Sequence, residues 1–437
     1  MAKSVVQWKH RWTFLMAATG SAFGLGNIWK LPYITGLYGG GAFIVVFLAC
    51  IVLIGVPLMM AESLLGRMGR ADPVTTMQKL SQEENQGGRW TWVGGMGVIT
   101  GLLIMMFYSV VAGWVLAYVV KSFAGSYSGF DATAVGELFA AHTSEFAPQF
   151  MFHTIFTVLT GIIVAAGITR GIGRGVETMM PILFLFILVL LGYSMATGDF
   201  NAAVDFMFIP DFSKLSTEAV LVAMGHAFFS LSLGMGAIMA YGAYMPQDAS
   251  ISKTILTVAL LDTAFGLLMG LCIFPLIFAN SMEPTSGPGL LFVSLPIAFA
   301  TMPFGVLMGS LFFLLVSLAA LTSSISLIEP GVAWLEKRKT NRVTATVILC
   351  LTAWIGGMLC IGWSQVFDFL DALTSRYLLP LGGLAIACFA GWVMQPEKLQ
   401  QAADMNDAGF RLWQFLLRYI SPLGIILIFL HSFGLFA

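Results

Sequence analysis

The stretch TGSAFGLGNIWKLP, residues 19–32, places glycines and polar residues inside a segment that is otherwise apolar enough to cross a membrane. A glycine in a helix interior costs about 1 kcal/mol relative to alanine, so Gly20, Gly24 and Gly26 predict an interrupted helix. A break at bilayer depth frees backbone N–H and C=O groups, which are costly unless paired. Half-helix N-termini suit a carboxylate, and exposed carbonyls suit a cation. The stretch therefore predicts a site for a charged solute or ion, although small residues also permit close helix packing.

A second interruption lies in FFSLSLGMGAIMAYGAY, residues 228–244, where Ser230, Ser232, Gly234 and Gly236 break an apolar run. Glycine-interrupted helices at matching positions of two halves are typical of inverted-repeat transporters. Because the two interruptions are five spanning segments apart, we interpret the chain as two corresponding halves. The repeated break favours a binding site over packing alone.

Other polar residues fall inside apolar segments. In SLAALTSSISLIEP, residues 317–330, three hydroxyls are consecutive: Thr322, Ser323 and Ser324. Membrane hydroxyls usually bond their own helix backbone, but two beside a broken helix suit a dehydrated Na⁺. Asp262 is an acid in mid-span and is functional by default. Glu62 is expected to accept N–H groups of the broken first helix, and His226 is expected to be a packed, hydrogen-bonding residue.

The composition indicates a polytopic membrane protein. Of 437 residues, 58% are hydrophobic and 10% are charged, which leaves too little polar surface for a soluble fold. The net charge of −1 gives no general attraction to nucleic acid. The five cysteines have no metal-motif spacing and are interpreted as small core residues.

Runs of about 20 apolar residues are long enough to span a bilayer. They fall at 13–36, 41–66, 92–123, 150–168, 177–197, 218–243, 254–280, 303–333, 343–361, 370–394 and 412–436. Among the connections, DPVTTMQKL predicts a surface helix that begins at Pro73 with Asp72 as its cap. The apolar segment 281–302 predicts two short helices that dip toward the protein.

Basic residues set the orientation. Of the 21 Lys and Arg residues, only Lys121 and Lys214 fall in loops on the outer side when the N-terminus is inside. The prediction is a multi-pass protein of the cell inner (plasma) membrane, with the N-terminus cytoplasmic and the C-terminus extracytoplasmic.

The predicted fold is an all-α membrane protein with an inverted five-helix repeat (5+5), discontinuous helices 1 and 6, and one additional helix. The whole chain, 1–437, is expected to be a single transmembrane transporter domain. Residues 13–197 form the first repeat, residues 218–394 the inverted second repeat, and residues 412–436 the eleventh helix.

Taken together, these segments resemble the neurotransmitter:sodium symporter family, in its bacterial amino-acid-transporting form. The motifs that carry the resemblance are GSAFGLGNIWKLPY, GGGAFIVVFLACIVLIGVPLMMAE, FFSLSLGMGA and ALTSSISL, and the resemblance runs from about residue 8 to residue 395. It implies two sodium sites and no organic cofactor. The first would use the Ala22 carbonyl, the Asn27 side chain, Ser230 and Asp262. The second would use the carbonyls of Gly20, Phe23 and Ala319 with the hydroxyls of Thr322 and Ser323.

The same resemblance implies a substrate site between the sodium sites. The substrate carboxylate would meet the N–H groups of Leu25 and Gly26 and the Tyr108 hydroxyl, near Gly24 and Ser323. The ammonium would face carbonyls of Ala22, Phe229 and Ser230. The side chain would be held by Ile104, Tyr108, Phe229, Ser232, Met235, Ser324 and Leu327. Monoamine-carrying relatives have an aspartate at the position of Gly24, so this glycine favours an amino acid. The side-chain subsite is apolar and carries no charge, which predicts a neutral hydrophobic or aromatic amino acid such as leucine, tyrosine or tryptophan.

Asp262 stands where chloride-dependent relatives have asparagine, and Phe47 and Gly266 stand at two of their anion-holding positions. A fixed carboxylate beside the first sodium replaces a mobile anion, which predicts chloride-independent transport.

The gate residues depart from the family pattern. The inner-gate positions hold Val5 and Lys337, so Lys3, Lys9, Arg11 and Glu336 are candidate substitutes with the pairing left open, while Tyr244 matches the gate tyrosine. Outside, Lys30 replaces an arginine and has Asp371 as a candidate partner, and Tyr108 and Phe229 form the lid.

The function expected from these residues is sodium-coupled symport of the amino acid by alternating access, with no enzyme activity. A monomer in the lipid bilayer is expected to suffice, with a small-molecule substrate and no nucleic-acid partner. Three alternatives stay open: proton coupling through Asp262, a substrate-gated channel or sensor, and an intramembrane enzyme, for which no nucleophile–base pair is visible.

Overall fold

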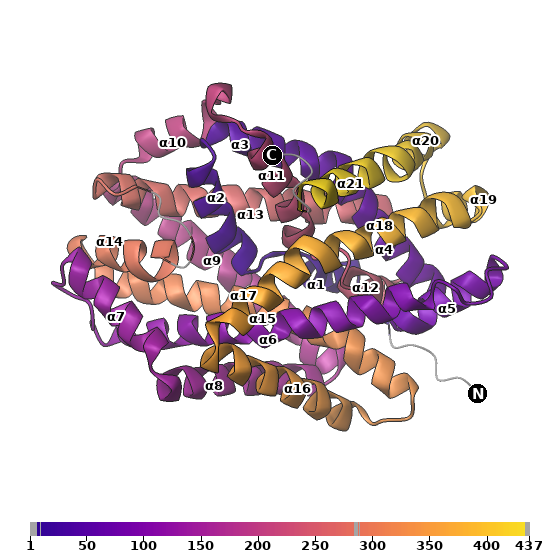
Figure 1. Ribbon diagram of the computed structural model, residues 1–437, viewed down its shortest axis with the longest axis horizontal. Helices are drawn as coiled ribbons and strands as arrows, with labels where there is room; N and C mark the ends of the chain where they lie inside the picture. Colours follow the sequence, from indigo (N-terminus) through magenta and orange to yellow (C-terminus); the bar gives the residue numbers. More distant parts are fainter. Residues whose placement is uncertain (1–6, 9, 284–286, 288, 433–437) are drawn as a thin grey trace.

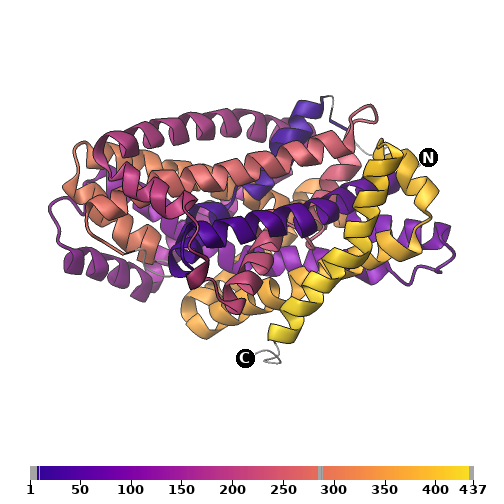
Figure 2. The ribbon, with the colours of Figure 1, turned by 90° about the horizontal axis from the view of Figure 1, so that it is seen from above.

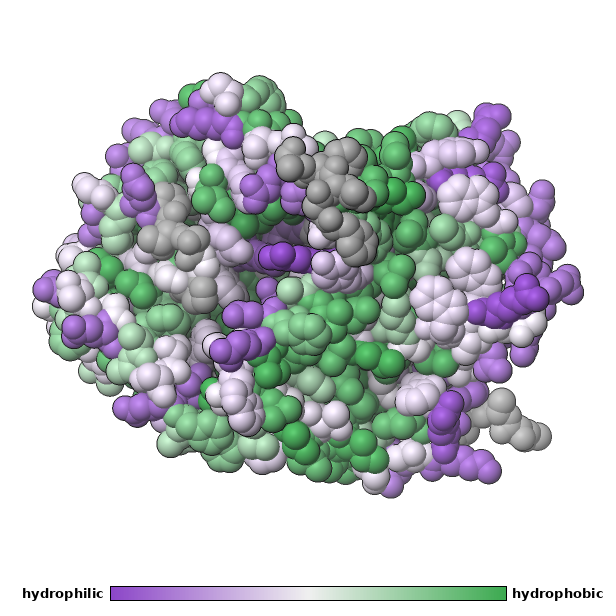
Figure 3. Space-filling model, in the orientation of Figure 1, coloured by the Kyte–Doolittle hydropathy of each residue, from purple (hydrophilic) through white to green (hydrophobic). Residues whose placement is uncertain are grey.

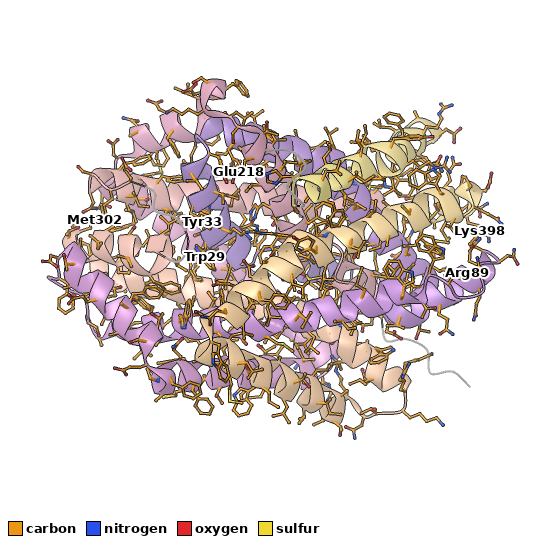
Figure 4. All side chains as sticks on the ribbon, in the orientation of Figure 1. Trp29, Tyr33, Arg89, Glu218, Met302 and Lys398 are labelled. Carbon is orange, nitrogen blue, oxygen red and sulfur yellow. The ribbon has the colours of Figure 1, made fainter. Side chains whose placement is uncertain are left out.

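The computed structural model describes residues 7–8, 10–283, 287 and 289–432, and these form helices and connecting turns without a β-strand. Most helices run along one direction, the horizontal of Figure 1, and Figure 2 shows the same bundle from above. Arg89 and Lys398, predicted for one side of the membrane, lie at one end of the bundle, whereas Met302, predicted for the opposite side, lies at the other end (Figure 4). The bundle therefore has the two ends that the loop pattern requires.

Nine helices of the described residues are long and apolar enough to cross a membrane, including several that contain a π-helical turn. They are Gly41–Gly69 (α3 to α4), Thr91–Phe123 (α6), Phe146–Ala165 (α8), Ile168–Thr197 (a π turn and α9), Ile251–Ala279 (α13), Gly305–Lys337 (α15), Arg342–Gly362 (α16), Ser364–Val393 (α17 to α18) and Asp407–Ser432 (α20 to α21). Each corresponds to one of the predicted spans. The all-helical membrane fold is thereby confirmed.

The two remaining predicted spans, the first and the sixth, are each broken into two helices. The first consists of α1 (Arg11–Ala22) followed by a π turn (Gly26–Lys30) and α2 (Leu31–Leu37). The sixth consists of α11 (Thr217–Ser230) and α12 (Ala237–Tyr244). Figure 1 places α1 and α12 near the centre of the bundle, surrounded by the unbroken helices. The glycine pattern correctly located both interruptions.

Short helices make the connections. They are α5 (Pro73–Glu83), α7 (Ala132–Ser144), α10 (Phe200–Phe208), α14 (Leu295–Thr301) and α19 (Pro396–Ala403). Helix α5 begins as predicted, because the Asp72 side chain accepts a hydrogen bond of 3.0 Å from the N–H of Thr75. The prediction of two short helices in 281–302 is wrong for the residues that are described. There one continuous helix, Leu290–Thr301, begins with a π turn, and no glycine lies within it to divide it.

Helix α12 is held by very close packing against α4. A Cβ atom on Gly66 would lie 2.0 Å from the Met239 carbonyl oxygen, and one on Gly242 would lie 2.6 Å from the Ser63 carbonyl oxygen. Such distances are possible only for glycine, so the two backbones touch directly. The cysteines fit the same packed interior: all five are free thiols, four are buried, and Cys388 is half-buried. The second half of the broken sixth span is therefore anchored to an unbroken neighbour.

Candidate functional site

The break in the sixth span lies where glycine and serine adopt backbone conformations that regular helices exclude. In the sixth span, Ser232, Gly234 and Gly236 have φ angles of 55°, 80° and 73°. A Cβ atom on Gly234 would lie 2.3 Å from the Leu379 carbonyl oxygen. Gly234 is therefore required both by its positive φ and by the backbone that crosses it.

A buried carboxylate satisfies the second break. The Oε1 atom of Glu62, on α4, accepts a 2.7 Å hydrogen bond from the N–H of Gly234. The sequence interpretation had assigned this carboxylate to the first break, and that assignment is wrong because α4 packs against α12 rather than α1. Glu62 thus pairs with a backbone N–H that the unwound segment frees. Such pairing is required because the interior of a bilayer contains no water to bond the free group.

One cluster of oxygen atoms joins the first break, the end of α11 and the middle of α13. The Asn27 amide donates to Asp262 Oδ1 at 2.5 Å and to the Ala22 carbonyl at 3.3 Å. The Ser230 hydroxyl lies 2.6 Å from Asp262 Oδ2 and 2.9 Å from Asn27 Oδ1. All four residues are buried. The structure therefore brings together every protein group predicted for the first sodium site, and a carboxylate among neutral oxygens is a donor set that suits a hard cation.

A second oxygen cluster lies between α1 and α15. The Ser323 hydroxyl is 3.3 Å from the Gly20 carbonyl, and the Thr322 hydroxyl donates to the Ala319 carbonyl at 2.9 Å. Thr322 also packs against Gly20: a Cβ atom on Gly20 would lie 3.1 Å from the Thr322 Cβ atom. Phe23, whose carbonyl was predicted as the remaining ligand, follows directly at the end of α1. These atoms are again neutral oxygens at a helix break, which suits an alkali cation.

A central cavity lies between the two clusters, with a volume of about 30 Å³. An amino acid fits it only after its lining side chains move apart, and flexible Met235 is one of them. The lining includes most of the predicted substrate residues: Ala22, Gly24, Leu25, Gly26, Ile104, Tyr108, Phe229, Ser232, Met235, Ser323 and Leu327. Ser230 is absent from this lining because it belongs to the first oxygen cluster.

Ser324, also predicted to hold the substrate, faces a different helix. Its hydroxyl lies 2.8 Å from that of Thr160 on α8, on the side of α15 away from the cavity. Ser326, which the prediction missed, takes its place. Residues 323, 326 and 327 share one face of a helix, so the spacing in the sequence was sufficient to identify it. Leu379, on a distant segment, gave no such signal.

A chain of three hydroxyls forms one wall of the cavity. The Ser21 hydroxyl lies 2.8 Å from that of Ser326 and 3.1 Å from that of Ser232. The Ser232 hydroxyl also donates to the Ser21 carbonyl at 2.9 Å. The subsite that the sequence interpretation described as apolar therefore contains groups that hydrogen-bond a polar edge of a ligand.

At the first break, Tyr108 and Gly24 border a space beside the start of the following helix. The Leu25 N–H donates to the Tyr108 hydroxyl at 3.5 Å. A Cβ atom on Gly24 would lie 2.8 Å from the Ser323 hydroxyl and 3.5 Å from that of Tyr108. Any side chain at position 24 therefore occupies the space between these hydroxyls, which face the N–H groups that suit a carboxylate.

The predicted outer gate is not closed by an ion pair. Lys30 Nζ lies 5.2 Å from the centre of the Phe229 ring, and the ion pairs within 4 Å in the described part of the chain do not include Lys30 with Asp371. Lys30 and Asp371 both line two further cavities, of about 260 and 420 Å³, and Phe229 borders each of these cavities as well. Trp29 and Tyr33 line the smaller one (Figure 4), and Figure 3 shows a hollow with hydrophilic walls close to the position of Tyr33. This side of the central cavity is therefore the more open one.

The opposite side is closed by a buried charged network. The Tyr244 hydroxyl, at the end of α12, donates to Glu329 Oε1 at 2.7 Å. Arg342 pairs with Glu329 at 2.5 Å and with Glu336 at 2.9 Å. Trp8 packs edge-on against the Tyr244 ring and donates its backbone N–H to the Tyr244 carbonyl.

This arrangement assigns partners that the sequence left open. Glu336 pairs with Arg342, a residue that the prediction did not consider, and Arg11 donates to the Thr254 hydroxyl instead. Lys337 is exposed. Val5, Lys3 and Lys9 lie outside the described residues.

His226 is buried as predicted, but neither ring nitrogen has a hydrogen-bond partner among the described residues, and its ring packs against Phe47.

Comparison with known proteins gives concordant results. The family model of the sodium:neurotransmitter symporter family matches residues 6–132 and 147–436. The uncharacterized sodium-dependent transporter YhdH of Bacillus subtilis is 36% identical over 449 residues, covering 98% of each chain, and an uncharacterized sodium-dependent transporter of Haemophilus influenzae is 28% identical, covering 97% of each. The crystal structure of MhsT in complex with L-phenylalanine superposes with a TM-score of 0.90 at 37% identity, covering 98% of this chain and 99% of that one.

The family model and the MhsT structure each match nearly the whole chain, including both helix breaks. The protein belongs to the sodium:neurotransmitter symporter family, whose members are sodium-dependent transporters and not enzymes.

Proposed function

We propose that this protein carries a neutral hydrophobic or aromatic L-amino acid into the cell together with two sodium ions. The observation that supports this most strongly is the position of one small cavity between two buried clusters of oxygen atoms, each at a helix break. The carboxylate of a bound amino acid is then shared between the N–H groups of the first break and the sodium ion beside Asp262. Sodium and substrate thereby strengthen each other's binding.

The cavity lining supports the substrate class. Among the described residues no charged side chain lines it, so glutamate and lysine have no counter-ion for their side chains. Its hydroxyl wall of Ser21, Ser232 and Ser326 suits the indole N–H of tryptophan or the phenol of tyrosine, while leucine or phenylalanine contact the apolar walls. The related MhsT was crystallised with L-phenylalanine.

Alternating access follows from the two sides of the cavity. Substrate and sodium enter past Lys30 and Asp371, and the rings of Tyr108 and Phe229 then cover them. The inner side opens when α1 and α12 separate from α15, which requires the Tyr244–Glu329 hydrogen bond to break. Each Na⁺ that enters gains about 2.3 kcal/mol per 100 mV and about 1.4 kcal/mol per tenfold gradient. Two ions supply roughly 7 kcal/mol, enough for about a 10⁵-fold substrate gradient.

We place the protein in the cell inner (plasma) membrane, with a cytoplasmic N-terminus and an extracytoplasmic C-terminus. The support is that basic residues concentrate in the loops predicted for one side of the membrane, and that two of them, Arg89 and Lys398, lie at one end of the bundle. Transport needs the five-helix units 13–197 and 218–394 to move against each other, and the helix within 412–436 follows them in the chain. Because both units belong to one chain, a monomer suffices for transport.

The substrate class is tested by competition. Binding of labelled L-phenylalanine to the purified protein in sodium buffer is expected to be displaced by leucine, tyrosine and tryptophan. It is expected to persist with equal concentrations of glutamate, lysine or glycine, because glutamate and lysine add an unpaired charge and glycine has no side chain to contact the apolar walls. Displacement by glutamate or lysine as strong as by leucine contradicts the proposed substrate class.

Transport is expected to be independent of chloride. The Asp262 carboxylate is a fixed negative charge in the first oxygen cluster, so no mobile anion is needed to neutralise the sodium ion. Replacing chloride by gluconate at constant sodium is expected to leave the initial uptake rate unchanged. A several-fold loss of uptake contradicts this role of Asp262.

The inner closure is tested with two neighbouring tyrosines. Tyr244→Phe removes the hydroxyl that holds α12 to Glu329, whereas the buried Tyr241 hydroxyl on the same helix has no partner among the described residues. A hydrogen bond to a charged group contributes about 1.5–3 kcal/mol, so Tyr244→Phe is expected to shift the population toward the inward-open form about tenfold or more. Labelling of a cysteine introduced on the inner side of the cavity measures the shift in population, and Tyr241→Phe serves as the control. Equal labelling of the two variants contradicts the proposed closure.

A further inference from the structure

An apolar groove runs along the outside of the bundle between α8 and α16, away from the broken helices. Its volume is about 420 Å³. Val158, Gly161 and Ala165 line it from α8, and Val347, Cys350 and Leu351 line it from α16. Both helices lie at the lower edge of Figure 1, where Figure 3 shows a mostly hydrophobic surface. Since both cross the membrane, the groove faces lipid.

The polar atoms of the groove are already satisfied. The Thr154, Thr157 and Thr346 hydroxyls donate to backbone carbonyls of their own helices, at 2.7, 2.9 and 2.9 Å. The Trp354 indole N–H donates to the Thr154 hydroxyl at 2.9 Å. The groove therefore presents hydrocarbon contacts without free hydrogen-bonding groups. This excludes a polar solute and fits an alkyl chain.

The dimensions of the groove match one lipid chain. It follows α8 from Thr154 to its last residue, Ala165, which is about 17 Å at 1.5 Å per residue. That length is about half of the roughly 30 Å hydrocarbon thickness of a bilayer, hence one leaflet. The volume spread over this length gives a cross-section of about 25 Å², whereas a helix about 10 Å across needs about 80 Å². The groove itself therefore encloses the cross-section of one acyl chain and not that of a helix.

Basic residues lie next to the helix ends at which the groove stops, the end of α8 at Ala165 and the start of α16 at Arg342. There the Arg342 Nε atom donates to the Val164 carbonyl at 2.8 Å and joins the ends of α8 and α16. Arg170 follows α8, and Lys337 and Lys339 precede α16. These three side chains are exposed, and within the described ranges none has a carboxylate partner within 4 Å. Unpaired basic residues at the end of an intramembrane groove attract an anionic head group.

We propose that this groove is a binding site for one anionic phospholipid. An acyl chain lies between α8 and α16, and the head group lies against Arg170 and Lys339. With the orientation given above, the lipid belongs to the cytoplasmic leaflet. Arg342 lies at the head-group end of the groove and forms an ion pair with Glu329, which accepts the hydrogen bond of Tyr244. The bound lipid therefore contacts the network that closes the inner side.

Native mass spectrometry of the detergent-purified full chain tests the proposal, with dioleoylphosphatidylglycerol and dioleoylphosphatidylcholine as probes. We expect one phosphatidylglycerol to be retained by the unmodified protein and lost from Gly161→Leu, which fills the groove. The control is Gly192→Leu, at an exposed glycine of α9 where a Cβ atom meets nothing within 4 Å. Cys350→Phe fills the groove from the facing helix and provides a second test should Gly161→Leu not fold.

The head group is tested with Arg170→Gln combined with Lys339→Gln. Each basic side chain near a membrane surface contributes about a fivefold preference, so the pair is expected to weaken phosphatidylglycerol retention about 25-fold and leave phosphatidylcholine unchanged. The control pair, Lys79→Gln with Arg89→Gln, removes the same charge at α5 and its following turn.

Three results overturn the proposal. They are undiminished retention in both groove-filling variants, equal retention of the two lipids, and a change from dimer to monomer specific to the groove-filling variants, which would place a second copy there. None of these measurements needs sodium or substrate, so their outcome is independent of the proposed transport function.

Discussion

Asp262→Asn is expected to raise the sodium concentration needed for half-maximal substrate binding by about a hundredfold to a thousandfold. The side chain keeps its shape and its contacts with Asn27 and Ser230, but the negative charge beside the ion is lost. Two unit charges about 4 Å apart at an effective dielectric constant of about 20 interact by about 4 kcal/mol, which corresponds to about three decades in affinity. Sodium titration of labelled L-phenylalanine binding measures the shift.

Glu62→Gln is the matched control for Asp262→Asn, because it also neutralises a buried acid next to a helix break. Glu62 bonds the Gly234 N–H, and the hydrogen bonds of the first oxygen cluster among the described residues do not include it, so the sodium midpoint is expected to change little. An unchanged sodium midpoint in Asp262→Asn, or an equal shift in both variants, contradicts the first sodium site.

Gly24→Asp is expected to abolish amino-acid binding, with a loss of about a thousandfold. A Cβ atom at this position already lies 2.8 Å from the Ser323 hydroxyl, and the new carboxylate occupies the space proposed for that of the substrate. Two like charges about 4 Å apart repel by about 4 kcal/mol in this environment, again about three decades. Competition binding of L-tryptophan and its decarboxylated analogue tryptamine measures the effect.

Gly24→Asn separates charge from size, since asparagine has the shape of aspartate without its charge. The steric loss is common to both variants, so only Gly24→Asp is expected to favour tryptamine over tryptophan. If the two variants bind tryptophan and tryptamine in the same ratio, the carboxylate of the substrate does not lie beside Gly24.

Most of the fold was predictable because a bilayer restricts the chain strongly. Spanning segments must be apolar and about 20 residues long, and irregular backbone at that depth is tolerated only where it lines a site, so Gly24 and Gly234 identified both breaks. The segment 281–302 was harder, because its apolar composition fits one or two short helices equally well. Periodicity alone does not fix where such a helix is divided.

The site was predictable where local spacing determines it and less so where distant helices meet. The family resemblance placed Asn27 and Asp262 in one sodium site, which stays a prediction, and their side chains are hydrogen-bonded in the structure. The partner of Glu62 depended on which helix α4 contacts. Arg342 was missed at the inner side because a basic residue at a helix start ordinarily indicates orientation only. Its pairing with the buried Glu329 is a tertiary contact between α15 and α16, and no pattern within either helix reveals it.

The most direct test is uptake of labelled L-phenylalanine into proteoliposomes with an inward sodium gradient. Sodium coupling at the two helix breaks predicts accumulation above the external concentration, which disappears when the gradient is dissipated or when Asp262 is replaced by asparagine. Equal uptake in sodium-free buffer, driven instead by an inward proton gradient, would contradict sodium coupling at the two helix breaks.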